Sequence, residues 1–256
     1  MTSEAVSKVV AVIDLSRYSD ICKELEQHLG TGAVVSVNNQ IRTLIHEALA
    51  EAKLDVDRLP YKGTGDGAIV VLDNSKDASN FAEKLHLSAE EHNRGKDVEL
   101  AQRHFRIGVF TGPVIIQPGD GRNKAGDFAG VVIGNAVRLE GACKTGEVLI
   151  DSESWADLSP ELRKLYGPAE TVKGKRKEEF QAHRRKVAAT APWDADDEAS
   201  AAGKGGSSSN DEEVVALHKR RLGHLEKQAA RFGAHTPAEI SMEIEDIKRI
   251  LSELES

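Results

Sequence analysis

The stretch YKGTGDGAIVV, residues 61–71, constrains the fold of this chain more than any other part of the sequence. Three glycines and one carboxylate, Asp66, precede an apolar run, and this combination predicts a tight hairpin with Asp66 in its turn. Glycine permits unusual backbone conformations and close approach of a ligand, whereas a lone carboxylate contributes little to packing. The stretch therefore predicts two adjacent antiparallel strands and a candidate site.

Apolar and amphipathic runs on either side of the hairpin predict the rest of a folded domain. The run KVVAVIDL is typical of a buried strand that ends near Asp14, before a polar loop and a helix. Further elements are expected as a helix at 76–93, a strand at 104–116, a short helix at 134–142 and a strand at 147–151. This order favours an α+β domain with a largely antiparallel sheet.

Composition divides the chain into three parts. Residues 1–186 form the predicted α+β domain. Residues 187–213 are poor in branched apolar side chains and rich in Ala, Gly, Ser and acidic residues, so we expect a flexible linker there. Residues 214–256 regain a helical period, with Gly233 placed as a C-cap and Pro237 at the start of a second helix. A C-terminal helical hairpin is expected, with an apolar seam that needs a partner.

Charge and cysteine content narrow the class of protein. A net charge of -8 argues against binding nucleic acid through phosphate neutralisation. The apolar run VVAVI is much shorter than the roughly 20 residues of a membrane-spanning helix, and the N-terminus has no signal-peptide pattern. Only Cys22 and Cys143 occur, too few for a disulfide framework or a zinc knuckle. We therefore expect a protein of the reducing cytoplasm, with no membrane and no nucleic acid among its partners.

Asp14 and Asp66, each at the end of a predicted strand, are candidate ligands for a pair of divalent cations. Magnesium commonly takes one or two carboxylates together with substrate phosphates. Aspartate is also frequent in turns, so both residues could serve the fold alone. The GTGDG stretch is no P-loop, because the GK[ST] that such a loop needs is missing.

Five motifs, in order over residues 8–184, resemble the class III nucleotidyl cyclases, the adenylate and guanylate cyclase family. IDLSRYSD is similar to the metal loop of that family, KGTGDG to its KxxGDG hairpin, RIGVFTGPV to its RIGIHTGPV strand, DFAGVVIGNAVRLE to its DxxGxxVNxAxRLE segment, and VKGKRKEEFQAHR to its closing strand. The resemblance implies a ferredoxin-like antiparallel sheet with flanking helices. It also implies conversion of a nucleoside triphosphate to its 3′,5′-cyclic monophosphate and pyrophosphate.

The resemblance assigns roles to particular residues. Asp14, Leu15 and Asp66 would hold two Mg²⁺ or Mn²⁺ ions. Arg138 would stabilise charge on the α-phosphate, Lys173 would reach the terminal phosphate, and the phosphates would be lined by the backbone amides of Leu15, Ser16, Arg17 and Tyr18. Without the motifs, Arg138 and Lys173 would be interpreted as solvated surface cations.

One departure from the family pattern affects the catalytic helix. The family has an asparagine four residues before the arginine, where this chain has Gly134, and Asn135 stands three residues before Arg138. Positions three and four apart share a helix face, so Asn135 could take over as the catalytic partner of Arg138. A degenerate domain that binds nucleotide without turnover is the alternative.

The family resemblance also implies a homodimer with active sites at its interface. In this family the metal loop and the arginine-bearing helix of one chain face different active sites, so two copies in a closed arrangement are required. The segment from His224 to Glu255 is similar to a short helical segment of bacterial conflict and signalling proteins. An effector or NTPase partner could bind there, or the segment is a generic coiled coil that strengthens the dimer.

The choice of base depends on three residues. Lys62 and Asp127 stand where adenylate cyclases carry an adenine-reading pair, which favours ATP. Tyr61 instead resembles the bulky residue with which pyrimidine cyclases of bacterial antiphage systems fill the space of a purine. Tyr61 could also simply point into the core. The prediction from the sequence is a uridylate or cytidylate cyclase that makes a second messenger in antiphage defence, with an ATP-using cyclase as the alternative.

Overall fold

The computed structural model describes residues 4–117, 127–173, 179–191 and 193–194, so the predicted hairpin at 214–256 lies outside the described residues. None of the described helices is long and apolar enough to cross a membrane. In chain order the elements are β1 (Ala5–Leu15), α1 (Tyr18–Leu29), α2 (Thr31–Glu51), β2 (Tyr61–Gly63), β3 (Gly67–Leu72), α3 (Ser75–Asn93), the 3₁₀ turn η1 (Glu99–Ala101), β4 (Phe105–Gln117), β5 (Asp127–Ala129), α4 (Val131–Glu140), β6 (Glu147–Asp151), α5 (Ser152–Asp157), α6 (Pro160–Arg163), β7 (Ala169–Lys173) and β8 (Glu179–Lys186).

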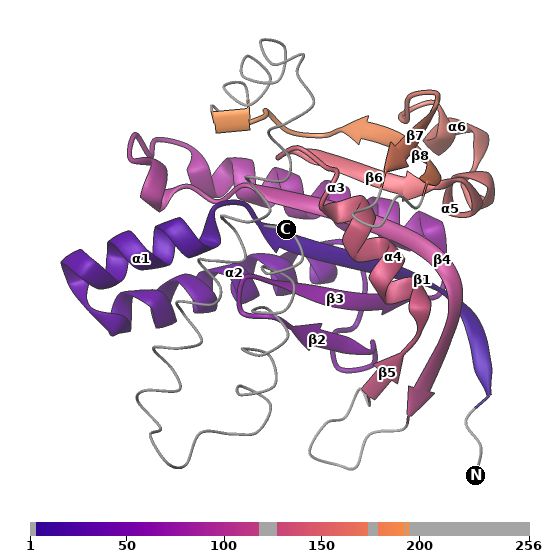
Figure 1. Ribbon diagram of the computed structural model, residues 1–256. Helices are drawn as coiled ribbons and strands as arrows, with labels where there is room; N and C mark the ends of the chain where they lie inside the picture. Colours follow the sequence, from indigo (N-terminus) through magenta and orange to yellow (C-terminus); the bar gives the residue numbers. More distant parts are fainter. Residues whose placement is uncertain (1–3, 118–126, 174–178, 192, 195–256) are drawn as a thin grey trace, which may run out of the picture. The chain divides into compact units, whose positions relative to one another are not determined.

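The described strands form one sheet in the order β2-β3-β1-β4-β6-β8-β7, with β5 pairing β4 off this path (Figure 1). β4 and β6 run parallel, and the other pairs in the described sheet are antiparallel. The predicted hairpin is present, because β2 pairs antiparallel with β3 from Tyr61 opposite Val70 to Gly63 opposite Ala68. The expected α+β domain with a largely antiparallel sheet is confirmed.

Helices cover both faces of β1, which explains why this strand is a continuous apolar run. Val9, Ala11 and Ile13 belong to the larger core, which includes residues of α2 and α3. The alternate residues Val10 and Val12 belong to a second core with residues of α4, the helix drawn in front of the strands in Figure 1. Near the end of the strand the half-buried Asp14 stands between two buried residues, Ile13 and Leu15.

α4 lies directly against β4 because Gly108 has no side chain. A Cβ atom at Gly108 would lie 2.2 Å from the backbone nitrogen of Glu140 and 2.3 Å from the backbone oxygen of Ala136. No larger residue fits between the strand and the helix at this distance. The close contact fixes the position of α4, and with it the two residues expected to act in catalysis, relative to the central strands.

A short segment after β8, residues 187–191 and 193–194 and here called the strap, packs against the domain. Val187 and Ala188 donate backbone hydrogen bonds to the Gly146 oxygen, at 2.9 and 3.1 Å. The first residues of the expected linker at 187–213 are thus held by backbone contacts that composition does not reveal. Residues 195–213 lie outside the described residues, and a linker there stays a prediction.

Candidate functional site

The structure brings Asp14 and Asp66 together. Asp14 stands near the end of β1, opposite Gly67 in the β1–β3 ladder. The Leu15 amide donates to the backbone oxygen of Asp66 at 2.8 Å, which ties the hairpin turn to the end of β1. Burial raises the pKa of the Asp14 carboxyl, a hydrogen bond from Arg106 and the charge of that residue lower it, and the nearby charge of Asp66 raises it further, with a net increase. The two carboxylates are therefore close enough for the charge of Asp66 to act on Asp14.

Gly67 permits this close approach of the hairpin to β1. A Cβ atom at this position would lie 1.9 Å from the backbone oxygen of Ile13 and 3.1 Å from the Cα atom of Asp14. Both atoms belong to the main chain of β1, which cannot move aside as a side chain could. Gly67, the second glycine of the GDG sequence, therefore sets the spacing between β1 and the turn that carries Asp66.

Arg106 is a member of this site to which the sequence analysis gave no role. It stands opposite Asp14 in the β1–β4 ladder, and its guanidinium donates to Asp14 Oδ2 at 2.5 Å. Its Nε also pairs with Glu140 Oε1 of α4 at 3.0 Å. Burial acts to lower the pKa of Arg106, but Glu140 and Asp14 outweigh it and the pKa is raised. The sequence marks Arg106 only as the arginine of the RIGVFTGPV motif. Its pairing with Asp14 can be recognised only when the register of β1 and β4 is known.

The turn between β1 and α1 only partly matches the expected phosphate cradle. The amides of Leu15 and Ser16 are already engaged, donating to the backbone oxygens of Asp66 and His104 at 2.8 and 2.9 Å. The amides of the first turn of a helix have no intrahelical acceptor, so those from Arg17 onward are placed to bind an anion. Tyr18 uses its hydroxyl to donate to Asn38 Oδ1 of α2 at 2.7 Å, which fixes the start of α1. A phosphate cradle at this turn would therefore begin at Arg17, two residues later than expected.

α4 carries the expected catalytic pair. The Arg138 guanidinium donates to Asn135 Oδ1 at 2.8 Å, so Asn135 does reach the arginine from its shifted position. A Cβ atom at Gly134 would lie 3.8 Å from Arg138 Nη1, in ordinary contact. Glu140 is buried against Arg106, and Arg138 lies two residues earlier, about 200° around the helix. Arg138 is therefore on a different side of α4 from Glu140, the residue that contacts Arg106.

Lys173 is exposed at the end of β7, the edge strand opposite the β2–β3 hairpin. Four strand spacings separate β1 from β7 in the sheet order, which corresponds to about 19 Å. A lysine side chain does not cover that distance. The structure thus does not bring Lys173 to the Asp14–Asp66 pair of the same chain.

The three residues expected to read the base lie in different environments. Tyr61 packs against the larger core, with its ring edge-on to His46 of α2 at 5.4 Å, and burial raises the pKa of its hydroxyl. Lys62 is the next residue along β2, so its side chain leaves the opposite face of the strand, and it is exposed. Asp127 is exposed at the start of β5. Within the described residues no hydrogen bond or ion pair joins Lys62 to Asp127.

Comparison with known proteins identifies the fold. No family model and no curated protein matches the sequence. The solved structure of the guanylyl cyclase Cya2 is 16% identical, with 75% of this chain and 98% of that chain covered and a TM-score of 0.58. The guanylate cyclase domain of RhGC from Catenaria anguillulae, solved in complex with GTP, is 18% identical, with coverage of 71% and 96% and a TM-score of 0.55. The non-canonical dimeric guanylyl cyclase domain of the RhoGC fusion protein from the aquatic fungus Blastocladiella emersonii is 18% identical, with coverage of 70% and 95% and a TM-score of 0.53.

The described domain therefore has the fold of the class III cyclase catalytic domains, as the motifs predicted. At these identities the likeness establishes the fold, whereas the reaction has to be argued from the residues of the site.

Proposed function

We propose that this protein is a nucleotidyl cyclase, which converts a nucleoside triphosphate to a 3′,5′-cyclic monophosphate and pyrophosphate. One observation carries the proposal: Asp14 and Asp66 lie side by side at the end of β1, in a domain with the fold of cyclases. The described residues contain no group of three or more His, Cys, Asp or Glu that could hold a metal. Two carboxylates nevertheless fit magnesium, which takes its remaining ligands from substrate phosphates and water.

The side chains of the site would divide the work of an in-line displacement. Magnesium or manganese ions held by Asp14, Asp66 and the main chain of Leu15 would lower the pKa of the ribose 3′-hydroxyl and neutralise the triphosphate. Arg106 keeps the Asp14 carboxylate in place through its 2.5 Å hydrogen bond. Amides at the start of α1 bind phosphate oxygens. Arg138, oriented by Asn135, stabilises the charge that develops at the α-phosphate.

The active enzyme would be a homodimer with two composite sites. The four strand spacings between β1 and β7, about 19 Å in all, keep Lys173 away from the carboxylate pair of its own chain. A second copy in a two-fold arrangement would bring Lys173 and Arg138 of one chain to Asp14 and Asp66 of the other. The similar cyclase domain from Blastocladiella emersonii is a non-canonical dimer, which supports association of such domains in pairs, whereas the two-fold arrangement proposed for this chain rests on the positions of its own residues.

ATP is the substrate that the described residues favour. The sequence-based prediction of UTP or CTP relied on Tyr61 filling the space of a purine, on the altered Gly134–Asn135 region and on the C-terminal segment. Of these grounds the first is weakened, because Tyr61 packs against His46 on the face turned to α2. Lys62 leaves the other face of the same strand, so a pocket lined by Lys62 would not contain Tyr61. We therefore place ATP first. A pyrimidine substrate is the alternative, and the antiphage role and the effector or NTPase partner stay predictions attached to it.

A substrate panel tests the proposal. The purified full-length chain is incubated with Mn²⁺ and each of ATP, GTP, UTP and CTP, and the products are resolved by chromatography. We expect cyclic AMP and pyrophosphate as the main products. A larger yield of cyclic UMP or cyclic CMP at equal concentration would restore the pyrimidine prediction, and binding without any cyclic product would support the inactive alternative.

A pair of variants of the hairpin provides the control. Asp66→Ala should abolish product formation while the protein stays folded, because the carboxylate accepts one local hydrogen bond, from Thr64 at 2.7 Å. Asp73→Ala removes an exposed carboxylate just beyond the other end of β3, where its partner is Lys8, and should leave turnover unchanged. Equal activity of the two variants would contradict the metal assignment.

A further inference from the structure

The turn from Ser16 to Arg17 links β1, the strand that carries Asp14, to α1. The backbone of this turn is held in a conformation that costs free energy. Arg17 has a φ angle of 58°, in the left-handed region that residues other than glycine rarely adopt. Such a conformation persists only where surrounding contacts enforce it. The contacts of this turn therefore determine the positions and directions of the first backbone N–H groups of α1.

Trp193 of the strap supplies contacts to both residues of the turn, from 177 positions further along the chain. Its indole N–H donates to Ser16 Oγ at 3.2 Å, and the Arg17 guanidinium lies 5.1 Å from its ring centroid. The ring of His104 meets the indole edge-on at 5.1 Å, and the backbone oxygen of His104 accepts from the Ser16 amide at 2.9 Å. Trp193 and His104 together contact the buried Ser16, and Trp193 also contacts the exposed Arg17.

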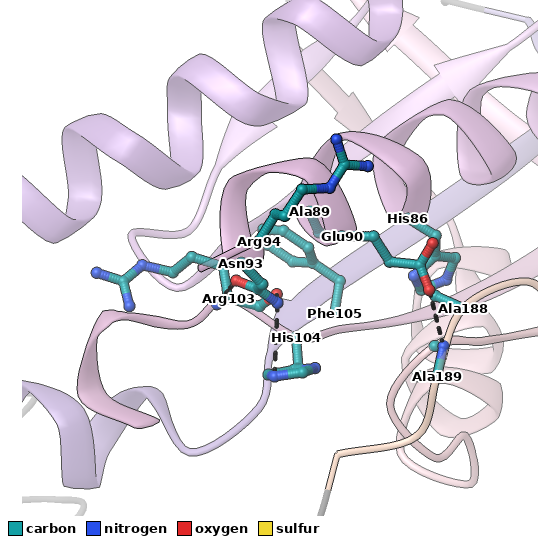
Figure 2. Close-up of a pocket in the computed structure, with 11 residues that line it drawn as sticks. His86, Ala89, Glu90, Asn93, Arg94, Arg103, His104, Phe105, Ala188 and Ala189 are labelled. Atoms are coloured by element: carbon teal, nitrogen blue, oxygen red, sulfur yellow. Dashed lines mark hydrogen bonds between the residues drawn. The ribbon is translucent and has the colours of Figure 1, made fainter. Parts of the chain in front are cut away.

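The strap is anchored at a few points on the domain. Asp194 Oδ2 accepts from the Thr145 amide at 2.7 Å and from its hydroxyl at 2.6 Å. Figure 2 shows the Ala189 amide donating to Glu90 of α3, at 3.0 Å. Beside this contact lies a cavity of about 380 Å³, lined in part by Ala188, Ala189 and Phe105. The strap thus has open space along part of its length, beside Ala188 and Ala189. Val187 nevertheless packs against the larger core and Ala191 is buried, so undocking is expected at the end of the strap that carries Trp193.

We propose that Trp193 is a positioning residue for the triphosphate. The docked strap holds the Ser16–Arg17 turn so that the first amides of α1 are arranged for phosphate binding, and undocking of the strap weakens that binding. What the turn binds rests on the proposed function, whereas the coupling of the strap to the turn rests on the contacts of Trp193 alone. Because the chain continues from Asp194, a change in the C-terminal part of the protein would reach the site through one tryptophan.

Three variants of the full-length protein test the proposal by two independent measurements. Hydrogen exchange at the Ser16 and Ile21 amides, which donate to the backbone oxygens of His104 and Arg17 at 2.9 Å, reports opening of the turn, and steady-state kinetics separate KM from kcat. Trp193→Ala should speed exchange at these amides and raise KM for the triphosphate roughly 10-fold, since it loses a hydrogen bond and a cation–π contact, while kcat stays near wild type. Trp193→Phe keeps a ring under Arg17 and should recover part of both effects. Trp155→Phe is the matched control, because its indole stacks on His183 away from the turn.

The outcomes separate the two proposals. Wild-type exchange at the Ser16 and Ile21 amides in Trp193→Ala overturns the positioning role, as does an equal change in Trp155→Phe. A loss of kcat at unchanged KM also overturns it. If the wild-type protein makes no cyclic product, the proposed function fails, and the exchange measurement still decides whether the strap holds the turn.

Discussion

Replacement of Gly67 by alanine should force the hairpin away from β1 and destabilise the protein at the carboxylate pair. The added methyl group would lie 1.9 Å from the Ile13 oxygen, 2.7 Å from the Ile13 carbonyl carbon and 3.1 Å from the Asp14 Cα atom. All three atoms belong to the main chain of a central strand. Rotation of a side chain therefore cannot relieve the overlap.

The size of the effect follows from the displacement that is needed. To reach an ordinary contact, β3 must move more than about 1 Å from β1, in an interior that is closely packed. That movement breaks the 2.8 Å bond from the Leu15 amide to the Asp66 oxygen. Overpacking costs about 1–3 kcal/mol and the lost hydrogen bond about 1 kcal/mol, so the free energy of unfolding should fall by about 2–4 kcal/mol.

Urea unfolding followed by circular dichroism measures this change, with Gly32→Ala as the matched control. Gly32 lies in α2, where an added Cβ atom meets nothing within 4 Å. The same chemical change should therefore stabilise the protein there, by up to about 1 kcal/mol, because alanine favours a helix. A Gly67→Ala protein within about 0.5 kcal/mol of wild type, the range of ordinary surface substitutions, would refute the packing argument.

Two further predictions concern the assembly and the core. Asp66→Ala mixed with Arg138→Ala should recover up to about a quarter of wild-type turnover, because half of randomly re-paired dimers are mixed and each has one intact site of two; no recovery after demonstrated subunit exchange would contradict shared sites. Burial lowers the pKa of His86 from 6.5 to about 4, so the unfolded chain binds more protons between these values and the free energy of unfolding falls as the pH is lowered through this range. The loss from pH 7 to pH 5 should be about 2 kcal/mol, and His86→Gln should largely remove it in urea unfolding at both pH values.

The sequence predicted those parts of the fold that depend on local pattern. The strand at 147–151 and the hairpin at the GTGDG stretch both appear where expected, since apolar runs bounded by glycine or polar residues leave few alternatives. The helix expected at 134–142 instead begins at Val131. Its β-branched start, Val131 to Ile133, resembles a strand locally, and packing of Val132 against Gly112 of β4 overrides that preference.

The candidate site was predictable where it lies in a motif and not where it depends on register or on distant contacts. Asp14 and Asp66 were paired from their places at the ends of predicted strands, and the family pattern assigned both to the metal site. The partner of Arg106 becomes visible only when Asp14 and Arg106 stand opposite each other in the sheet. Trp193 lies in a segment whose composition resembles a linker, so its contact with Ser16 carried no signal in the sequence.

The distance between Lys173 and the carboxylate pair has a consequence for how signal output would depend on protein abundance. Under the proposed function no single chain contains a complete active site, so the rate of product formation is second order in protein concentration when most chains are monomeric. Below the dissociation constant of the dimer, product formation would rise with the square of the chain concentration, and a tenfold dilution would cost about a hundredfold in rate. Expression level would then set a threshold, below which the cell makes almost no product and above which output climbs steeply.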